Sequence, residues 1–361
     1  MRYRKFADTG AEVSEIGLGT WQLGAEWGDV SDAEAEAILE AAAIGLLAAI
    51  WLRQPGSAVS AVPGSKTPAA DAERVIRNYA MQGYDIIFGT TFEHMDPLLN
   101  VAKDYPDIAF EHCSGFKTGP NMGNYFARMY QGEYLAGYMA GLMGFKNVGT
   151  VATNPIPEPI RGINAFTIGM LKGLKEGGHP FNADKVNTVV WLKAWRDAIN
   201  ETTLAETLVA RKHDLIRQMA DTPDSSVAAC AAGVPAIGYG EDAARYGADC
   251  ALLSSVWNWG PIYVDKVQQV MDGTWKAGEY WGGFDKNNVV LSDFHATVPE
   301  AVRQKVMAEK DKLAAGQDDI FAGPLYDQQG TLMVPEGQKA SDKDLLTMGW
   351  LMKGVRGSIP Q

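Results

Sequence analysis

Runs of apolar residues alternate with amphipathic stretches from about residue 70 to the end of the chain. Most of the apolar runs are continuous, which is typical of strands that are buried on both faces of a parallel sheet. Because helical stretches lie between them, the order predicts an α/β fold in which helices cover parallel sheets. Strands are predicted at 84–91, 108–115, 147–153, 186–195, 213–220, 235–240, 251–256 and 288–294.

Two of the intervening helices have recognisable ends. The stretch 71–83 carries apolar residues at helical spacing and finishes at Gly83. The stretch 261–273 has Pro261 in its first turn and Gly273 at its end. Proline at the start and glycine at the end are typical helix boundaries, so both segments are predicted as helices.

The first 70 residues do not follow this alternation. The apolar run 41–52 is about half of the ~20 residues that a membrane span needs, and it is predicted as a core helix. Residues 52–70 are rich in Pro, Gly, Ser and Ala and predict a linker with one weak strand at 57–62. With a strand at the start of 15–23, this part has a strand, helix, strand order that fits one βαβ unit.

Charge and cysteine content exclude several function classes. The formal net charge is -12 and the sequence contains no run of Lys and Arg, so nucleic acid and anionic membrane surfaces are excluded as partners. Cys113, Cys230 and Cys250 lack the spacing of a zinc or redox site, and we expect them to be small buried apolar residues. No export signal is recognised in the sequence, and the cysteines leave the cellular compartment open.

No metal or cofactor site is predicted. Glu111 and His112 are neighbours in a predicted strand, so their side chains point to opposite faces and do not readily share an ion. The remaining histidines show no ligand spacing. We therefore expect neither a metal nor a cofactor.

Residues 1–42 resemble the N-terminus of aldo-keto reductases, on the segment "EIGLGTWQLGAEWGDVSDAEAEAILEAA" at 15–42. The resemblance implies a β-hairpin followed by the first strand and helix of a barrel. However, the strand that would end in a catalytic Asp is replaced by "IGLLAAIWLRQPG" at 44–56, and "GLGTWQLG" is not a dinucleotide fingerprint. We therefore predict that the chain is not an enzyme, and that this head supplies the first strand of the first lobe in an apparent chimera.

The remainder, from about residue 70, resembles the basic membrane protein family, the PnrA-like substrate-binding proteins of ABC importers. The segments that carry the resemblance include "DAERVIRNYAMQGYDIIFGTTFEHMDP" at 71–97, "PIPEPIRGINAFTIG" at 155–169 and "SSVWNWGPIYVDKVQQVMDGTWKAGEYWGGF" at 254–284. The resemblance implies a type I periplasmic-binding-protein fold, in which two doubly wound parallel-sheet lobes with a hinge close on a purine base or nucleoside. It also implies an ABC permease as partner and a periplasmic location.

The resemblance suggests a division of the chain into lobes. Residues 1–56 form the head that completes lobe 1, 57–145 and 254–284 form lobe 1, 146–253 and 285–330 form lobe 2, and 331–361 form a C-terminal segment.

Candidate ligand-binding residues follow the predicted strands, because ligands of open α/β sheets bind beyond the carboxyl ends of the strands. Aromatic side chains there can stack on a flat heterocycle, and carboxylates can accept hydrogen bonds from its N–H groups. Each residue type also has an ordinary structural role: an aromatic ring often belongs to the core, and Asp221 or Asp242 equally suits a helix cap. The candidates are Trp27, Asp29, Thr91, Phe92, Trp195, Asp197, Asp221, Thr222, Asp242 and Trp257, with Glu26 beside the first two.

Two departures from the family bear on the ligand. Gly240 stands where nucleoside-binding members usually carry an Asp that holds ribose hydroxyls, and Trp257 replaces a Lys found in many members. The loss of both polar groups favours a free base such as adenine over a nucleoside. An NADPH-dependent oxidoreductase and a folded chimera that binds nothing remain the alternative functions.

Overall fold

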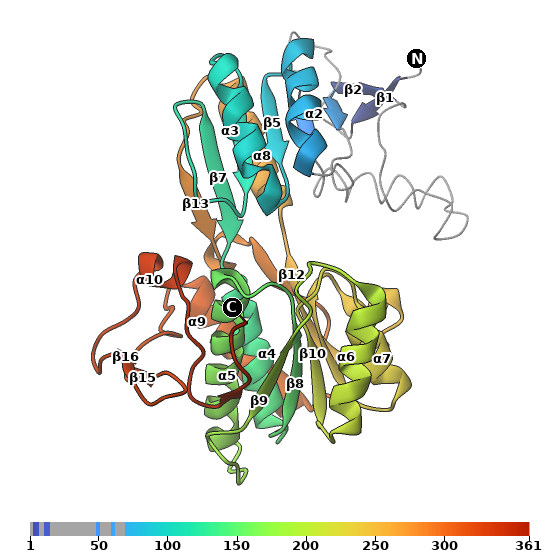
Figure 1. Cartoon of the computed structure of the whole chain (residues 1–361), viewed down its shortest axis with the longest axis vertical. Helices are drawn as coiled ribbons and strands as arrows, with labels where there is room; N and C mark the ends of the chain where they lie inside the picture. The colour runs from blue at the N-terminus through green and yellow to red at the C-terminus, as the bar shows by residue number, and fades with distance from the viewer. Residues whose placement is uncertain (1–2, 7–10, 15–47, 51–58, 62–68, 361) are drawn as a thin grey trace. The chain divides into compact units, whose positions relative to one another are not determined.

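The computed structural model describes residues 3–6, 11–14, 48–50, 59–61 and 69–360 (Figure 1). The chain divides into two compact units, and it passes from one unit to the other after Ala127, Trp257 and Gly282. Unit 1 comprises 1–127 and 258–282, and unit 2 comprises 128–257 and 283–361. The sequence had placed these crossings after 145, 253 and 284. The first crossing comes earlier because the helix that follows Ala127 packs along a helix of unit 2.

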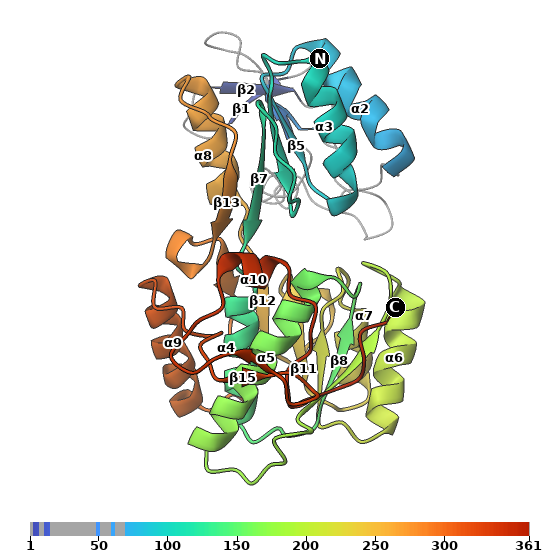
Figure 2. The ribbon, with the colours of Figure 1, turned by 60° about the vertical axis from the view of Figure 1, so that its left-hand side comes forward.

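Unit 1 is built on a six-stranded sheet with the order β13-β7-β6-β5-β3-β4. Its central strands are parallel, whereas β3 runs antiparallel to β5 and to β4. The strands are β3 (Ala48–Ile50), β4 (Val59–Ala61), β5 (Ile86–Gly89), β6 (Ala109–Cys113), β7 (Met122–Ala127) and β13 (Glu279–Gly282). Helices α2 (Ala69–Gln82) and α3 (Met95–Asp104) cover one face and α8 (Gly260–Met271) covers the other (Figure 2).

The N-terminal part agrees with the sequence only in places. Strands β1 (Tyr3–Phe6) and β2 (Ala11–Ser14) form an antiparallel hairpin, as the resemblance to reductases implies. The weak strand expected at 57–62 is confirmed by β4. The helix expected at 41–52 is wrong where it is described, because Ala49 and Ile50 pair with β5 and sheet pairing overrides the local helical preference. The strand expected within 15–23 and the candidates Glu26, Trp27 and Asp29 lie outside the described residues.

Unit 2 is built on a seven-stranded sheet with the order β14-β12-β11-β10-β8-β9-β17. Its strands are parallel except for β14, which runs antiparallel to β12. They are β8 (Val148–Ala152), β9 (Asn187–Trp191), β10 (Leu215–Gln218), β11 (Ala236–Gly240), β12 (Ala251–Trp257), β14 (Val289–Leu291) and β17 (Val355–Arg356). Helices α4 (Tyr130–Leu142) and α5 (Pro157–Glu176) lie on one face, and α6 (Ala198–Ala210) and α7 (Asp224–Ala231) lie on the other (Figure 1).

All eight strands expected after residue 70 are confirmed, as β5, β6, β8, β9, β10, β11, β12 and β14. Both expected helices are confirmed as α2 and α8. After residue 70, the sequence missed three strands of these two large sheets, β7, β13 and β17, whose residues lack a continuous apolar run.

Helices α4 and α5 touch along their backbones. A Cβ added at Gly137 would lie 2.0 Å from the Phe166 carbonyl oxygen, and one added at Gly169 would lie 2.1 Å from the Tyr134 carbonyl oxygen. The same crowding recurs one turn further along both helices, at Gly141 and Gly173. Only glycine permits so close an approach of two helices, so these four positions define the seam.

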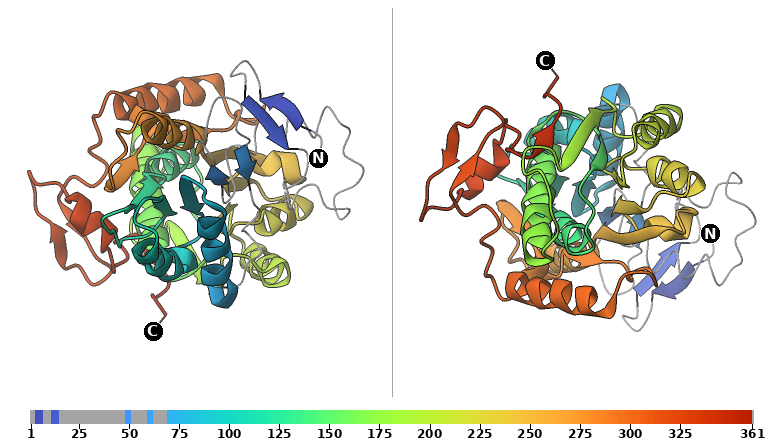
Figure 3. Two further views of the ribbon diagram at one scale, coloured as in Figure 1. Left: turned by 90° about the horizontal axis from the view of Figure 1, so that it is seen from above. Right: turned by 90° about the horizontal axis from the view of Figure 1, so that it is seen from below.

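The C-terminal part of the chain packs on the outer side of this helix pair. Helix α9 (Glu300–Ala314) packs on α4, and α10 (Asp342–Leu346) packs on α5, beside a small hairpin of β15 (Leu325–Tyr326) and β16 (Leu332–Val334). Figure 3 shows this segment, in red, on the side of α5 away from the sheet. Buried Asn164 of α5 anchors it, since the amide donates to the Trp350 carbonyl at 2.8 Å and accepts from the Met352 N–H at 2.9 Å.

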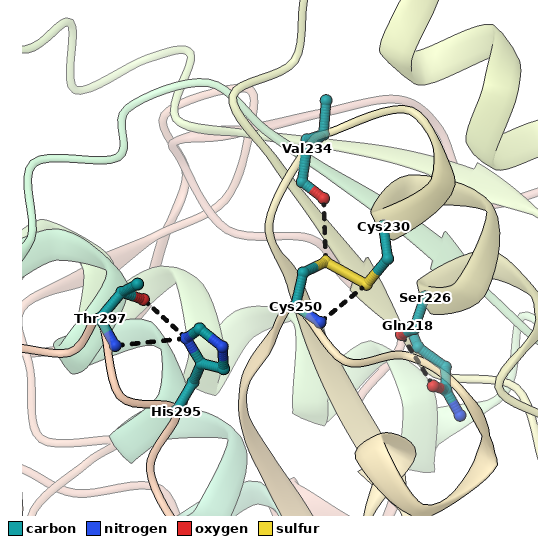
Figure 4. Close-up of a disulfide and its surroundings, with 7 residues drawn as sticks. All are labelled: Gln218, Ser226, Cys230, Val234, Cys250, His295 and Thr297. Atoms are coloured by element: carbon teal, nitrogen blue, oxygen red, sulfur yellow. Dashed lines mark hydrogen bonds between the residues drawn. A yellow bond between two sulfur atoms is a disulfide. The ribbon is translucent and has the colours of Figure 1, made fainter.

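Two of the three cysteines are not free. Cys230 at the end of α7 and Cys250 before β12 form a disulfide with a Cα–Cα distance of 5.4 Å (Figure 4). The expectation of three unlinked apolar cysteines is therefore wrong for this pair, since Val227 and Cys230 of α7 pack against Ala248 and Ala251 and so bring the two cysteines together. Cys113 on β6 is free and buried, as expected.

Candidate functional site

The parallel strands of unit 2 place most candidate residues at one edge of its sheet. Strands β8 to β12 run in the same direction, so the loops after Ala152, Trp191, Gln218, Gly240 and Trp257 emerge at their shared carboxyl edge. Trp195 and Asp197 follow β9, Asp221 and Thr222 follow β10, Asp242 follows β11, and Trp257 ends β12. The structure thus brings these six candidates to the same edge of one unit.

Trp257 and Gly240 lie against each other on neighbouring strands. Gly240 has φ of +81°, and a Cβ added there would be 3.6 Å from the Trp257 indole. The same indole meets the ring of Tyr239 edge to face, with centroids 5.9 Å apart. The two positions at which the sequence departs from the family it resembles are therefore neighbours, with an aromatic ring beside a glycine.

The loops after β9 and β10 are tied together. The Asp221 backbone N–H donates to the Trp195 carbonyl at 2.9 Å. The Thr222 hydroxyl donates to the buried Glu201 carboxylate at 2.7 Å. The first bond holds the backbones of the two loops together at Trp195 and Asp221, whose side chains are half-exposed and exposed respectively.

Two of the acidic candidates cap helices. Asp197 caps α6 by accepting from the Asn200 N–H at 3.1 Å. Asp242 caps a short 3-10 helix (Ala243–Tyr246) by accepting from the Ala244 N–H at 3.3 Å, which is the alternative role that the sequence left open. Pro223 rather than Asp221 is the cap residue of α7, so the Asp221 carboxylate has no capping role there.

Buried charged side chains lie beneath this edge of the sheet. Arg217 of β10 forms an ion pair with Glu133 of α4, and both side chains are almost fully buried. Burial raises the pKa of Glu133 to about 7, although the neighbouring Arg217 guanidinium opposes the rise. Glu158, at the start of α5, accepts from the Tyr239 hydroxyl at 2.7 Å, and burial likewise raises the pKa of Glu158.

Unit 1 presents a second carboxyl edge, where the loops after β5 and β6 meet. The half-buried Phe92 ring lies 6.2 Å, centroid to centroid, from the exposed ring of Phe116. Beneath them, buried His112 is hydrogen bonded through Nε2 to the Thr91 carbonyl at 2.9 Å. Thr91 and Phe92 therefore lie together at this edge, as the sequence predicted from their position after the strand.

Sequence reasoning missed three residues of these edges. Glu158 was missed because it follows β8 by several residues, and Tyr239 was missed because it lies within β11. Phe116 follows β6 in the segment "CSGFK", and its position after a predicted strand was a usable signal.

No group of three or more His, Cys, Asp and Glu side chains that suits a metal ion occurs among the described residues. Within the same residues, no helix is long and apolar enough to cross a membrane.

Comparison with known proteins identifies the fold and the family. A family model described as ABC transporter substrate-binding protein PnrA-like matches residues 56–317. The chain belongs to this family. It is 35% identical over 293 residues to a purine-binding protein from Brucella abortus, with 81% of each chain covered. It is 34% identical over 293 residues to a protein from Haloferax volcanii that is named as an ABC transporter glucose-binding protein, covering 81% of this chain and 70% of the other.

Solved structures agree on the fold of this substrate-binding protein. A solute-binding protein from Conexibacter woesei matches with a TM-score of 0.59 at 24% identity, over 79% of this chain and 90% of the other. One from Aeropyrum pernix matches with a TM-score of 0.59 at 17% identity, over 70% and 81%. Together with the parallel sheets, these matches confirm the type I periplasmic-binding-protein fold.

Membership of the family settles several expectations. PnrA-like proteins bind a small molecule for an ABC transporter and are not enzymes, so the prediction that this chain is not an enzyme is confirmed. Such proteins work outside the cytoplasm, either in the periplasm or at the cell exterior. The family match begins at residue 56. The reductase resemblance of residues 1–42 and the idea of a chimera therefore stay predictions.

Proposed function

We propose that this substrate-binding protein takes a purine base, with adenine favoured over a nucleoside, and delivers it to the permease of an ABC importer in the periplasm. One similar protein is named as purine-binding, which supports the ligand class. The Cys230–Cys250 disulfide supports an oxidising compartment, because disulfides persist mainly in exported proteins.

The contact between Trp257 and Gly240 carries the preference for a free base. A ribose needs hydrogen-bonding partners, whereas an indole beside a bare glycine offers an apolar face on which a flat ring can stack. Thr91, Phe92, Trp195, Asp197, Asp221, Thr222 and Asp242 are the other proposed ligand contacts in the described residues. For Asp197 and Asp242 the ligand would share a carboxylate that also caps a helix.

A hexose is the second candidate ligand, because another similar protein is named as glucose-binding. Aromatic faces also pack against the apolar side of sugar rings, so Trp195 and Trp257 suit either ligand. The two candidates differ in what must bind: a planar nitrogen heterocycle or a polyol.

Isothermal titration calorimetry of the full chain with adenine, adenosine, guanosine, glucose and NADPH separates these functions. We expect adenine to bind more tightly than adenosine, and NADPH to give no heat. Trp257→Ala should weaken adenine binding by roughly tenfold, because one base–aromatic stack is worth about 1–3 kcal/mol, whereas Trp257→Phe should retain most of the affinity. Binding of glucose without any purine would refute the proposed ligand class, and silence across the panel would favour a chimera that binds nothing.

A further inference from the structure

His112 of unit 1 connects the two loops that carry Thr91, Phe92 and Phe116. Its imidazole is fully buried near the end of β6, with Nε2 2.9 Å from the Thr91 carbonyl oxygen. A carbonyl oxygen only accepts hydrogen bonds, so Nε2 carries the hydrogen and donates it. Burial lowers the pKa of His112 to about 4, so the ring is neutral at pH 7 and Nδ1 holds a lone pair.

The other ring nitrogen faces the loop after β6. A Cβ added to Gly115 would lie 2.0 Å from His112 Nδ1, so the glycine backbone lies directly over the imidazole. Nδ1 is buried and has no hydrogen-bond partner among the described residues. Because a side chain at 115 would need the same space as the imidazole, this arrangement requires glycine.

The backbone next to Gly115 is held in an unusual conformation. Ser114 has φ of +61°, a region that residues other than glycine rarely adopt, and such strain persists only where the surroundings impose it. Further contacts join the loop after β6 to the start of helix α3. Phe116 N–H donates to the Met95 sulfur at 3.5 Å, and Lys117 pairs with Asp96 at 2.6 Å.

We propose that His112 is a positioning residue, which fixes the loop after β5 by a hydrogen bond and the loop after β6 by packing beneath Gly115. The two loops then present Phe92 and Phe116 at a fixed separation. This makes Phe116 a further ligand contact at the edge of unit 1. The inference rests on the proposed function only in assigning these loops to the ligand.

The test compares Gly115→Ala with Gly278→Ala, a matched control in unit 1 whose added Cβ would meet nothing within 4 Å. Amide hydrogen exchange of the ligand-free full chain measures the positioning directly. For Gly115→Ala we expect exchange at residues 90–94 and 113–117 to become at least tenfold faster than in wild type, with no such change for Gly278→Ala. Unchanged exchange in a folded Gly115→Ala variant would overturn the inference.

A second pair of variants covers the case in which Gly115→Ala does not fold. His112→Gln keeps an N–H that can donate to the Thr91 carbonyl, whereas His112→Leu removes it. We expect His112→Leu to speed exchange in both loops and His112→Gln to stay close to wild type. Equal exchange in His112→Leu and wild type would also refute the positioning role.

Titration with adenine measures whether the two loops contribute to ligand binding. The same loop-loosening variants should bind adenine roughly tenfold more weakly than wild type and Gly278→Ala, because the ring contacts must then be ordered on binding. Wild type without adenine binding would contradict the proposed function, while the exchange experiment would still decide the role of His112. Wild-type affinity in a variant with fast loop exchange would show that these loops do not contact the ligand.

Discussion

The Cys230–Cys250 disulfide should make a large contribution to the stability of unit 2. The bond joins residues 20 apart in sequence and closes a loop that contains β11 and its carboxyl-end residues Gly240 and Asp242. For a closed loop of this length the chain-entropy relation gives about 3 kcal/mol at 25 °C. In a unit of this size that corresponds to a fall in Tm of roughly 10 °C.

The experiment compares wild type with the double variant Cys230→Ala/Cys250→Ala in urea unfolding, with and without dithiothreitol. We expect dithiothreitol to lower the midpoint of wild type and to leave the double variant unchanged, since Cys113 is free and buried. Mass spectrometry with a thiol-specific label confirms the oxidation state in each sample. If fully reduced wild type unfolded at the same urea concentration as the oxidised protein, the entropic reasoning would be refuted.

Two further predictions concern stability. Burial lowers the pKa of His112 to about 4 from its ordinary value of 6.5, so the unfolded chain binds more protons between these values and stability falls as pH drops from 6.5 to 4. His112 alone should account for about 3 kcal/mol of that fall, and His112→Gln should flatten the dependence in urea unfolding at pH 4 to 7; an equally steep profile would argue against a neutral buried imidazole. Gly169→Ala should destabilise unit 2 by about 2 kcal/mol, because its Cβ would meet the Tyr134 carbonyl oxygen at 2.1 Å. In an uncrowded helix the same change stabilises by about 1 kcal/mol, so a rise in Tm would show that the helices can separate at no cost.

The strands after residue 70 were predictable because most of them are buried on both faces and read as continuous apolar runs. Val148–Ala152 and Ala251–Trp257 are examples, since packing on both sides leaves little room for polar residues. Glu279–Gly282 lies at the edge of its sheet and lacks such a run, so local sequence carries no comparable signal. Ala48–Ile50 was mistaken for helix because its identity as a strand depends on pairing with distant β5.

The candidate site was predictable in part, from the rule that ligands lie beyond the carboxyl ends of strands. That rule located Thr91, Phe92 and Trp257, but it did not identify which acidic residues cap helices. The capping bonds of Asp197 and Asp242 depend on the exact start of the following helix. The disulfide and the support from His112 depend on contacts between segments that only the folded chain brings together.

Strand β17 has a consequence for the order in which the protein folds. It follows every other described strand in the chain, yet it pairs with β9 and completes one edge of the unit 2 sheet. Until these residues leave the ribosome, β9 exposes an unpaired backbone edge and Asn164 lacks its partners at 350 and 352. Unit 2 therefore reaches its final structure only after residues 350–356 have been synthesised.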